Sequence, residues 1–373
     1  MRKLIPVLSI IITTVLMAGT ALAQNSVATA ANSTAARAQA GSLANLPEAE
    51  TLVYVSPQRI LRDAAPRVMS EADLAKMRSA FAEVKSQTGI DPLNINYVVL
   101  AIRFRKPAAD LKLMPPDYMV VAGGDFSAEA VMLLVRQASQ GKLREEKYGS
   151  KTLGLMTIDD IAKEAEKTPF LKSFSEVAIA SVSGDTVAAG SAAYVKAAID
   201  AADGKGRISA DALNSLLRDP DALVSVAGSP MTSFAKTFAL LGTETNPRAP
   251  KCDTKYGDFY AAVTMDSAAF KLRGTMNADN PDTAQIITNL LSGLFDYAKR
   301  QTKDQSAQTM MNNLTISAKE SDIVLEANVP QRAVADFVRE QMRPKPATSA
   351  SPAKTTAKRP RRPIRRRALK PKS

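Results

Sequence analysis

The most informative property of this 373-residue chain is what it lacks: it has no His, no Trp and a single Cys, Cys252. Without His it cannot form a Ser-His-Asp triad or a His-paired thiolate, and its own residues cannot build a His/Cys zinc cage. One thiol cannot make a disulfide within the chain, so burial alone must hold the core together. Aromatic residues make up only 5% of the sequence, which disfavours surfaces that stack on sugars or bases. Several classes of enzyme and binding protein are therefore excluded.

Positive charge is present in excess, and it lies at one end of the chain. The formal net charge is +12, from 49 Lys and Arg against 37 Asp and Glu. Residues 343–373 contain twelve basic residues and no acidic residue. Subtracting these twelve from the 49 leaves 37 basic residues in residues 1–342, equal to the 37 acidic ones. The sequence therefore predicts an electrically balanced body followed by a basic tail.

The amino-terminal segment has the pattern of a secretory signal peptide. Arg2 and Lys3 precede an uncharged stretch from Leu4 to Ala23, which ends in Ala-Leu-Ala before Gln24. A positive start, an apolar stretch and a small-residue ending predict export and cleavage after Ala23. An uncleaved membrane anchor is the alternative, because 20 uncharged residues approach the length that spans a bilayer. We therefore expect localisation in the periplasm or cell envelope, with residues 24–45 as a flexible leader.

The rest of the sequence alternates between short strand patterns and amphipathic helix patterns. Leu52 to Ser56 reads as a strand and Pro57 begins a helix. Ser70 opens a second helix that Gly89 closes. Further strands are predicted over 97–104, 118–126, 153–158, 177–182, 186–189, 223–226, 259–265, 270–276, 314–318 and 323–327. Further helices are predicted over 127–140, 191–204, 209–218, 281–303 and 330–342, with another through Phe234, Phe238 and Leu241.

The order of these elements predicts an α+β fold that is internally duplicated. Many neighbouring strands can pair as hairpins, which favours mainly antiparallel sheets with packed helices over a doubly wound parallel sheet. Each half reads β-α-ββα-ββα, so we expect a first half over 46–220 and a second over 221–342. No glycine-rich nucleotide-binding loop is present: Gly123-Gly124 and Gly204-Lys-Gly206 fit neither the dinucleotide nor the P-loop pattern.

The first half also resembles a family of exported bacterial proteins of unknown function. The resemblance rests on Leu46-Pro-Glu-Ala, Gly89-Ile-Asp-Pro92, Gly124-Asp-Phe126, and Gly190-Ser191 followed by Val195-Lys-Ala-Ala-Ile199. It runs across much of Leu46 to Arg218. It implies an exported α+β module without an established activity, and it transfers no functional residue.

The only nucleophilic arrangement left without His is a Ser-Lys pair, spaced S-x-x-K at the start of a helix. Three such pairs occur, at Ser139/Lys142, Ser233/Lys236 and Ser351/Lys354. Ser233 is the best placed, because it lies in the first turns of a predicted helix. Its companion motifs K-T-G and S-D-N are missing, so a Ser-Lys hydrolase is kept only as an alternative function.

Neighbouring carboxylates are the other source of chemistry, and three groups stand out. They are Glu145-Glu146, Asp159-Asp160 and Asp219-Pro-Asp221. Adjacent residues of a strand point to opposite faces, so Glu145 and Glu146 should not converge. Asp159 and Asp160 are expected to begin a short helix, where negative charge meets the positive end of the dipole. We expect no catalytic, cofactor-binding or metal-binding residue.

The basic tail is the candidate binding segment. It contains six Pro and no aromatic residue, so we expect it to be disordered. Each Lys or Arg near an anionic membrane contributes on the order of 1 kcal/mol to association. The predicted partner is an anionic membrane or envelope polymer; non-specific binding of nucleic acid is the alternative if the protein stays in the cytoplasm. The predicted anion-binding residues are Arg359, Arg361, Arg362, Arg365, Arg366 and Arg367.

Overall fold

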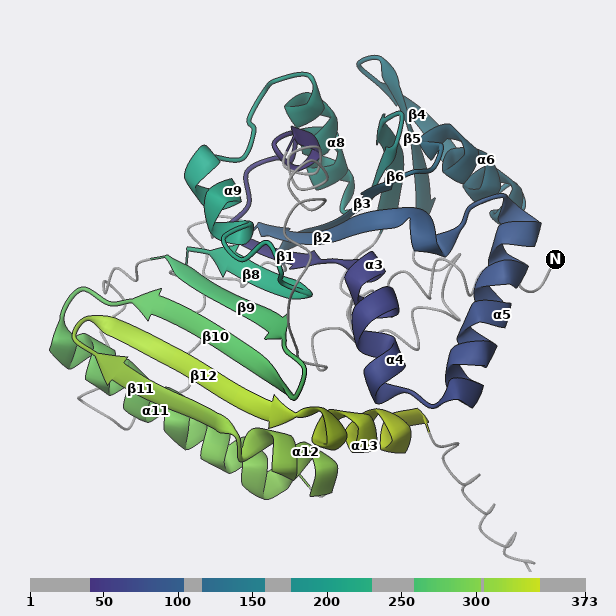
Figure 1. The fold of residues 1–373 in the computed structure, drawn as a ribbon. Helices are drawn as coiled ribbons and strands as arrows, with labels where there is room; N and C mark the ends of the chain where they lie inside the picture. The colour runs from purple at the N-terminus through teal and green to yellow at the C-terminus, as the bar shows by residue number, and fades with distance from the viewer. Residues whose placement is uncertain (1–40, 104–115, 158–175, 230–257, 303–304, 343–373) are drawn as a thin grey trace, which may run out of the picture.

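A computed structural model describes residues 41–103, 116–157, 176–229, 258–302 and 305–342. The described residues form one twelve-stranded sheet in which every neighbouring pair of strands is antiparallel, with helices packed against it (Figure 1). The predicted α+β class with antiparallel strands is confirmed.

The strands follow the chain in numerical order, but their order in the sheet differs. They are β1 (Thr51–Val55), β2 (Ile95–Arg103), β3 (Asp117–Gly124), β4 (Arg144–Tyr148), β5 (Lys151–Thr157), β6 (Glu176–Ser183), β7 (Thr186–Gly190), β8 (Val224–Gly228), β9 (Phe259–Met265), β10 (Ala269–Asn277), β11 (Leu314–Lys319) and β12 (Asp322–Pro330). Across the sheet the order is β11-β12-β10-β9-β8-β1-β2-β3-β7-β6-β5-β4.

The helices fill the connections between these strands. They are α3 (Pro57–Arg59), the π-helical turn η1 (Ile60–Ala64), α4 (Ala65–Val68), α5 (Glu71–Thr88), the 3₁₀ turn η2 (Pro92–Asn94), α6 (Ala128–Ala138), α8 (Ala192–Ala202), α9 (Ala210–Leu216), α11 (Pro281–Gln301), α12 (Gln305–Met311) and α13 (Gln331–Met342). The helix predicted through Phe234, Phe238 and Leu241 lies outside the described residues.

The strand order is the same in the two halves of the chain when it is read outward from the centre. One half runs β1-β2-β3-β7-β6 and the other runs β8-β9-β10-β12-β11, with β5 and β4 added at the edge of the first. The boundary predicted between residues 220 and 221 does not divide the sheet, because β1 pairs with β8 from Thr51↔Gly228 to Val55↔Val224.

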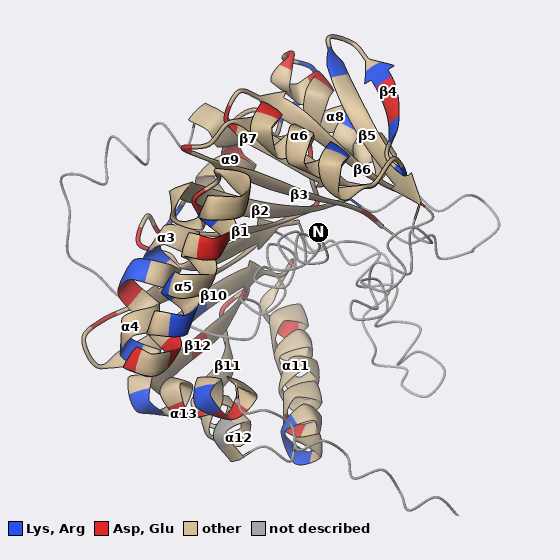
Figure 2. Cartoon of the chain, turned by 90° about the vertical axis from the view of Figure 1, so that its right-hand side faces the viewer, with Lys and Arg blue, Asp and Glu red and all other residues tan. Residues whose placement is uncertain are grey.

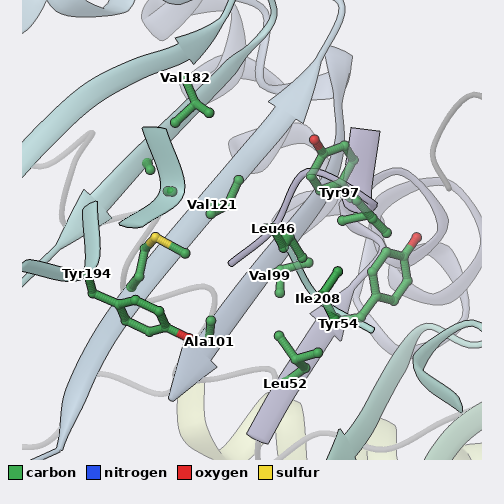
Figure 3. Close-up of a cluster of buried hydrophobic side chains, with 14 of the residues drawn as sticks. Leu46, Leu52, Tyr54, Tyr97, Val99, Ala101, Val121, Val182, Tyr194 and Ile208 are labelled. Atoms are coloured by element: carbon green, nitrogen blue, oxygen red, sulfur yellow. The ribbon is translucent and has the colours of Figure 1, made fainter. Parts of the chain in front are cut away.

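Buried side chains lie on both faces of the sheet, which explains why the central strands are continuous apolar runs. In β1, Leu52 and Tyr54 belong to the cluster formed with α8 and α9. Val55 belongs to the cluster on the opposite face, formed with η1 and α13. Figure 3 shows the first of these clusters, where Leu46 and Ile208 lie close to the rings of Tyr54 and Tyr97.

Local sequence signals fix several helix ends. The Ser70 hydroxyl caps α5 by accepting from the Asp73 amide at 3.2 Å, and Gly89 ends the helix with a φ of +72°. A positive φ of this kind is the position where glycine closes a helix at no steric cost. Ser127 and Ser209 cap α6 and α9 in the same manner. Ser191 occupies the N-cap position of α8, but its hydroxyl makes no cap bond.

Three features differ from the expectations. Strand β4 and helix α12 were not predicted, because Arg144–Tyr148 is almost entirely charged and Gln305–Met311 is short. The packed region also begins before Leu46, since Leu43 is fully buried in the main cluster. Residues 41–45 therefore belong to the folded body and not to a flexible leader.

Candidate functional site

The basic tail follows directly from α13, the last helix that the structure describes. Helix α13 buries Val334 against the sheet and ends at Met342, whose side chain is exposed. All six predicted anion-binding residues, from Arg359 to Arg367, lie outside the described residues. The structure therefore describes the chain up to the end of α13, a helix that contacts both α4 and α12.

The body itself carries charges of both signs, interspersed over its surface (Figure 2). Many of them are paired. Arg59 lies 2.7 Å from Asp221, Lys85 lies 2.9 Å from Asp91, and Arg144 lies 2.9 Å from Glu176; these are distances between side-chain nitrogen and oxygen atoms. A mixed surface of this kind creates no strong field of one sign.

The one Ser-Lys pair within the described residues is not arranged for catalysis. The Ser139 hydroxyl donates to the Arg136 carbonyl at 2.7 Å, and the Lys142 amide donates to the Ser139 carbonyl at 3.0 Å. Ser139 is thus the C-cap residue of α6, a structural role. The other two pairs, Ser233/Lys236 and Ser351/Lys354, lie outside the described residues.

Glu145 and Glu146 are held apart on the edge strand β4. Glu145 is bonded to Arg136 of α6, and Glu146 accepts from Lys196 of α8 at 2.5 Å. The Lys196 ammonium lowers the pKa of Glu146 below its ordinary value, with Arg144 adding to the effect. The two helices cover opposite faces of the sheet, since α8 packs with Ala178 and Ala180 and α6 packs with Ile179. The prediction that these carboxylates do not converge is confirmed.

Asp219 and Asp221 also have separate structural partners. The Tyr260 hydroxyl donates to Asp219 at 2.8 Å, while Arg59 donates to Asp221 at 2.7 Å. Burial, and then the bond to Asp219, raise the pKa of the Tyr260 phenol far above its ordinary value. These contacts tie the loop before β8 to β9 and to α3, so the two carboxylates do not share a ligand. Asp159 and Asp160 lie outside the described residues.

A partly buried ionic cluster at one end of β2 and β3 was missed by the sequence analysis. Asp117 is only 3% exposed, and the Arg103 guanidinium lies 3.3 Å from its carboxylate. The same guanidinium lies over the ring of Tyr194, 4.5 Å from the centroid, and the Tyr194 hydroxyl donates to the Glu48 carbonyl at 2.9 Å. Desolvation raises the pKa of Tyr194 strongly, so this phenol stays protonated. The cluster joins α8 to the sheet and the amino-terminal segment.

Two cavities in the described part of the chain are candidate sites. The first, about 330 Å³, is lined by small side chains and by the β6–β7 turn, where Asp185 accepts from Ser183 at 2.7 Å and from Thr186 at 3.0 Å. The second, about 480 Å³, lies between the helices α4 and α5 and is lined mainly by apolar side chains such as Leu74 and Phe81. In the first, the turn already uses the Asp185 carboxylate. The second cavity has no Ser, Thr or Cys among the described residues of its lining.

Two general features of the described residues bear on their chemistry. Over these ranges no three His, Cys, Asp or Glu side chains come together as a metal site. None of the described helices has both the length and the hydropathy that crossing a bilayer requires.

Comparisons with known proteins place the chain in no family. No family model matches it, and no curated protein matches it. Among solved structures it is similar to crystal forms I and III of TP0453, with 10% sequence identity and TM-scores of 0.39 and 0.38. The alignments cover 80% of this chain and 96% and 97% of the TP0453 chains. A likeness this distant identifies neither family nor activity.

Proposed function

We propose that this is an exported, non-enzymatic protein of the cell envelope that associates electrostatically with an anionic surface through its basic tail. The observation that carries the proposal is the separation of charge along the sequence. Residues 343–373 hold twelve cations and no anion, while residues 1–342 are balanced. Because the net charge of this segment does not depend on its conformation, attraction to anions follows from composition alone.

The candidate hydroxyl and carboxylates of the body that the structure describes make structural contacts. The Ser139 hydroxyl and the carboxylates of Asp219, Asp221, Glu145 and Glu146 all have structural partners. The described surface also pairs many of its own charges, so its contribution to anion binding is small compared with that of the tail.

The amino-terminal segment indicates in which compartment the anionic surface lies. Residues 1–23 have the signal-peptide pattern, and an exported protein meets acidic lipids and envelope polymers. At about 1 kcal/mol for each Lys or Arg near an anionic membrane, part of the tail is enough for stable association. Screening by salt weakens the attraction, which distinguishes it from apolar insertion.

Flotation with vesicles of defined anionic lipid content tests the proposal. The full chain should bind at low salt and detach as salt rises, whereas a chain ending at Met342 should not bind. A chain with Arg359, Arg361, Arg362, Arg365, Arg366 and Arg367 all changed to Gln should lose most of its binding, and the matched Arg→Lys chain should keep it. Equal retention of the full and shortened chains would refute the proposal.

Cell fractionation separates this function from its alternatives. The mature protein should be found in the envelope fraction, beginning at Gln24. A cytoplasmic protein with Leu4 to Ala23 still attached would favour nucleic-acid binding instead. Labelling by a serine-reactive acylating probe that is abolished by Ser233→Ala would favour the Ser-Lys hydrolase.

A further inference from the structure

Helix α11 exposes an apolar flank beside the face that packs on the sheet. Its inner face buries Ala284 and Ile287 against β10 to β12. Six large apolar side chains are exposed among the described residues, and four of them are on this helix. These four are Ile286 (41% exposed), Leu290 (39%), Leu294 (41%) and Tyr297 (60%). An apolar stripe concentrated on one helix is the mark of an interaction surface.

The spacing of this stripe is that of a helix-pairing seam. Ile286, Leu290, Gly293 and Tyr297 follow one another at intervals of four, three and four residues, the alternation that keeps a seam facing a partner helix. Gly293 has nothing within 4 Å of the position that a Cβ would occupy. The seam therefore has a notch in its middle, next to the projecting Leu290 side chain.

We propose that α11 pairs in antiparallel fashion with α11 of a second copy of this chain. A two-fold axis at the middle of the seam, between Leu291 and Ser292, sets Leu290 opposite the second copy's Gly293. The same axis sets Ile286 opposite the second copy's Tyr297. Each contact occurs twice, so one surface is complementary to itself, as a two-fold interface requires.

Charge complementarity supports this partner and this direction independently. Asp282 and Arg300 are exposed, and neither has an ion pair with a residue that the structure describes. They are separated by five helical turns, at 3.6 residues a turn, and so lie on one flank of the seam. In an antiparallel pair of identical helices, a flank of one helix faces the same flank of the other. The axis that matches Leu290 with Gly293 therefore brings Asp282 within one residue of the second copy's Arg300, about 1.5 Å along the helix. In a parallel pair the two Asp282 side chains would lie at the same height on opposite sides of the seam, far from either Arg300.

The size of the surface sets the strength of pairing. The seam from Ile286 to Tyr297 is about 16 Å long at a rise of about 1.5 Å a residue. A single helix pair of this length buries less surface than the roughly 1,200–2,000 Å² of a standard stable interface. The dimer is therefore expected to be concentration-dependent, with a dissociation constant in the micromolar range or weaker.

Sedimentation velocity over a concentration series tests the seam, using the chain purified as the cell processes it. Leu290→Glu should weaken dimerisation at least about tenfold, because it sets a charge in the middle of the seam. Leu133→Glu is the matched control: Leu133 is 52% exposed on α6, away from α11, and its replacement should leave the dimer unchanged. A chain that is monomeric at every concentration, or an equal effect of the two variants, overturns the proposal.

A charge-swap cycle at low ionic strength tests the direction of pairing. Asp282→Arg and Arg300→Asp should each weaken the dimer severalfold, because each replaces two attractions with two repulsions. The double variant should return to within about twofold of the natural chain. A double variant as weak as the single ones overturns antiparallel pairing.

The same variants separate a second copy from a lipid surface as the occupant of the seam. On anionic vesicles, Asp282→Arg should strengthen binding through the stripe and Arg300→Asp should weaken it, whereas in the dimer both single variants weaken association. If the chain stays monomeric and its vesicle binding follows that order, lipid covers α11 and the proposal is wrong.

Discussion

Asp117 is the most buried acidic residue among those described, and its setting makes Arg103 important for stability. The guanidinium lies 3.3 Å from the Asp117 carboxylate and 4.5 Å from the centre of the Tyr194 ring. A carboxylate removed from water is stable only with compensating charge or hydrogen bonds. Arg103 therefore serves both the ionic contact and the packing of α8.

Replacement of Arg103 by Ala should lower the free energy of unfolding by about 2 kcal/mol, since the buried Asp117 carboxylate loses the contact with the guanidinium. Arg144→Ala is the control, because Arg144 is 62% exposed in its own ion pairs. Its effect should stay below about 0.5 kcal/mol. Urea denaturation of both variants measures the two losses of stability. If they are similar, the Arg103–Asp117 contact contributes no more to stability than an exposed ion pair.

Gly190 ends β7 where the backbone of β3 passes very close. A Cβ at this position would lie 2.1 Å from the Tyr118 carbonyl oxygen and 2.7 Å from the Met119 Cα. Because both atoms belong to the backbone of a paired strand, they cannot move aside without breaking the β3–β7 register.

Gly190→Ala should therefore lower the free energy of unfolding by about 2 kcal/mol or more. Gly184→Ala, in the nearby β6–β7 turn, has no atom within 4 Å of the added methyl group and should change it by less than about 0.5 kcal/mol. Chemical denaturation compares the two. If the two variants lose equally little stability, the backbone of β3 can move away from the added methyl group without a large loss of free energy, contrary to this prediction.

At the scale of single elements, the β9–β10 turn depends on one carboxylate. Asp266 contacts the Lys271 ammonium at 2.6 Å and accepts from the Ala268 and Ala269 amides at 2.8 and 3.2 Å. The Lys271 ammonium, and then the amides, lower the pKa of Asp266 from 3.8 to about 2. The unfolded chain therefore binds this proton more readily than the folded one.

The sign of the pH dependence follows from that depressed pKa. The stabilisation from Asp266 is complete above the unfolded pKa near 4 and is lost as the pH falls toward 2. Asp266→Asn should lower the thermal unfolding midpoint at pH 6, and the difference from the natural chain should shrink between pH 4 and pH 2. Lys271→Met should reproduce part of that change, and a difference that stays constant with pH would contradict the assignment.

Helix ends were predicted well from the sequence where capping chemistry is local. Ser70 and Gly89 bound α5 as their residue types require. The N-cap bond expected of Ser191 is missing, and its buried hydroxyl has no partner among the described residues. The charged strand β4 was missed because an edge strand takes its structure from pairing with β5, not from an alternating apolar pattern.

The second face of α11 was also missed, for a related reason. Its apolar residues cover both sides of the helix, and the sequence alone does not tell which side the sheet buries. Only the packing of Ala284 and Ile287 identifies the flank with Ile286, Leu290 and Tyr297 as the exposed one.

At the scale of the whole molecule, the antiparallel α+β class was predictable, but the pairing of strands that are distant in sequence was not. Hairpins follow from strands that are neighbours in sequence, whereas the pairing of β1 with β8 connects residues far apart in the chain. The same limit applies to β3 and β7, which enclose the β4–β6 strands between them in sequence. Long-range pairings depend on how buried surfaces fit together, which residue patterns do not encode locally.

The central position of β1 has a consequence for how the protein is assembled. As the chain emerges amino end first, β1 can gain β2 early, but its other edge stays open until Val224–Gly228 has appeared. During that interval the unpaired edge of β1 can form hydrogen bonds with a strand of another unfolded chain. Newly made chains should therefore depend on a chaperone until their second half has emerged.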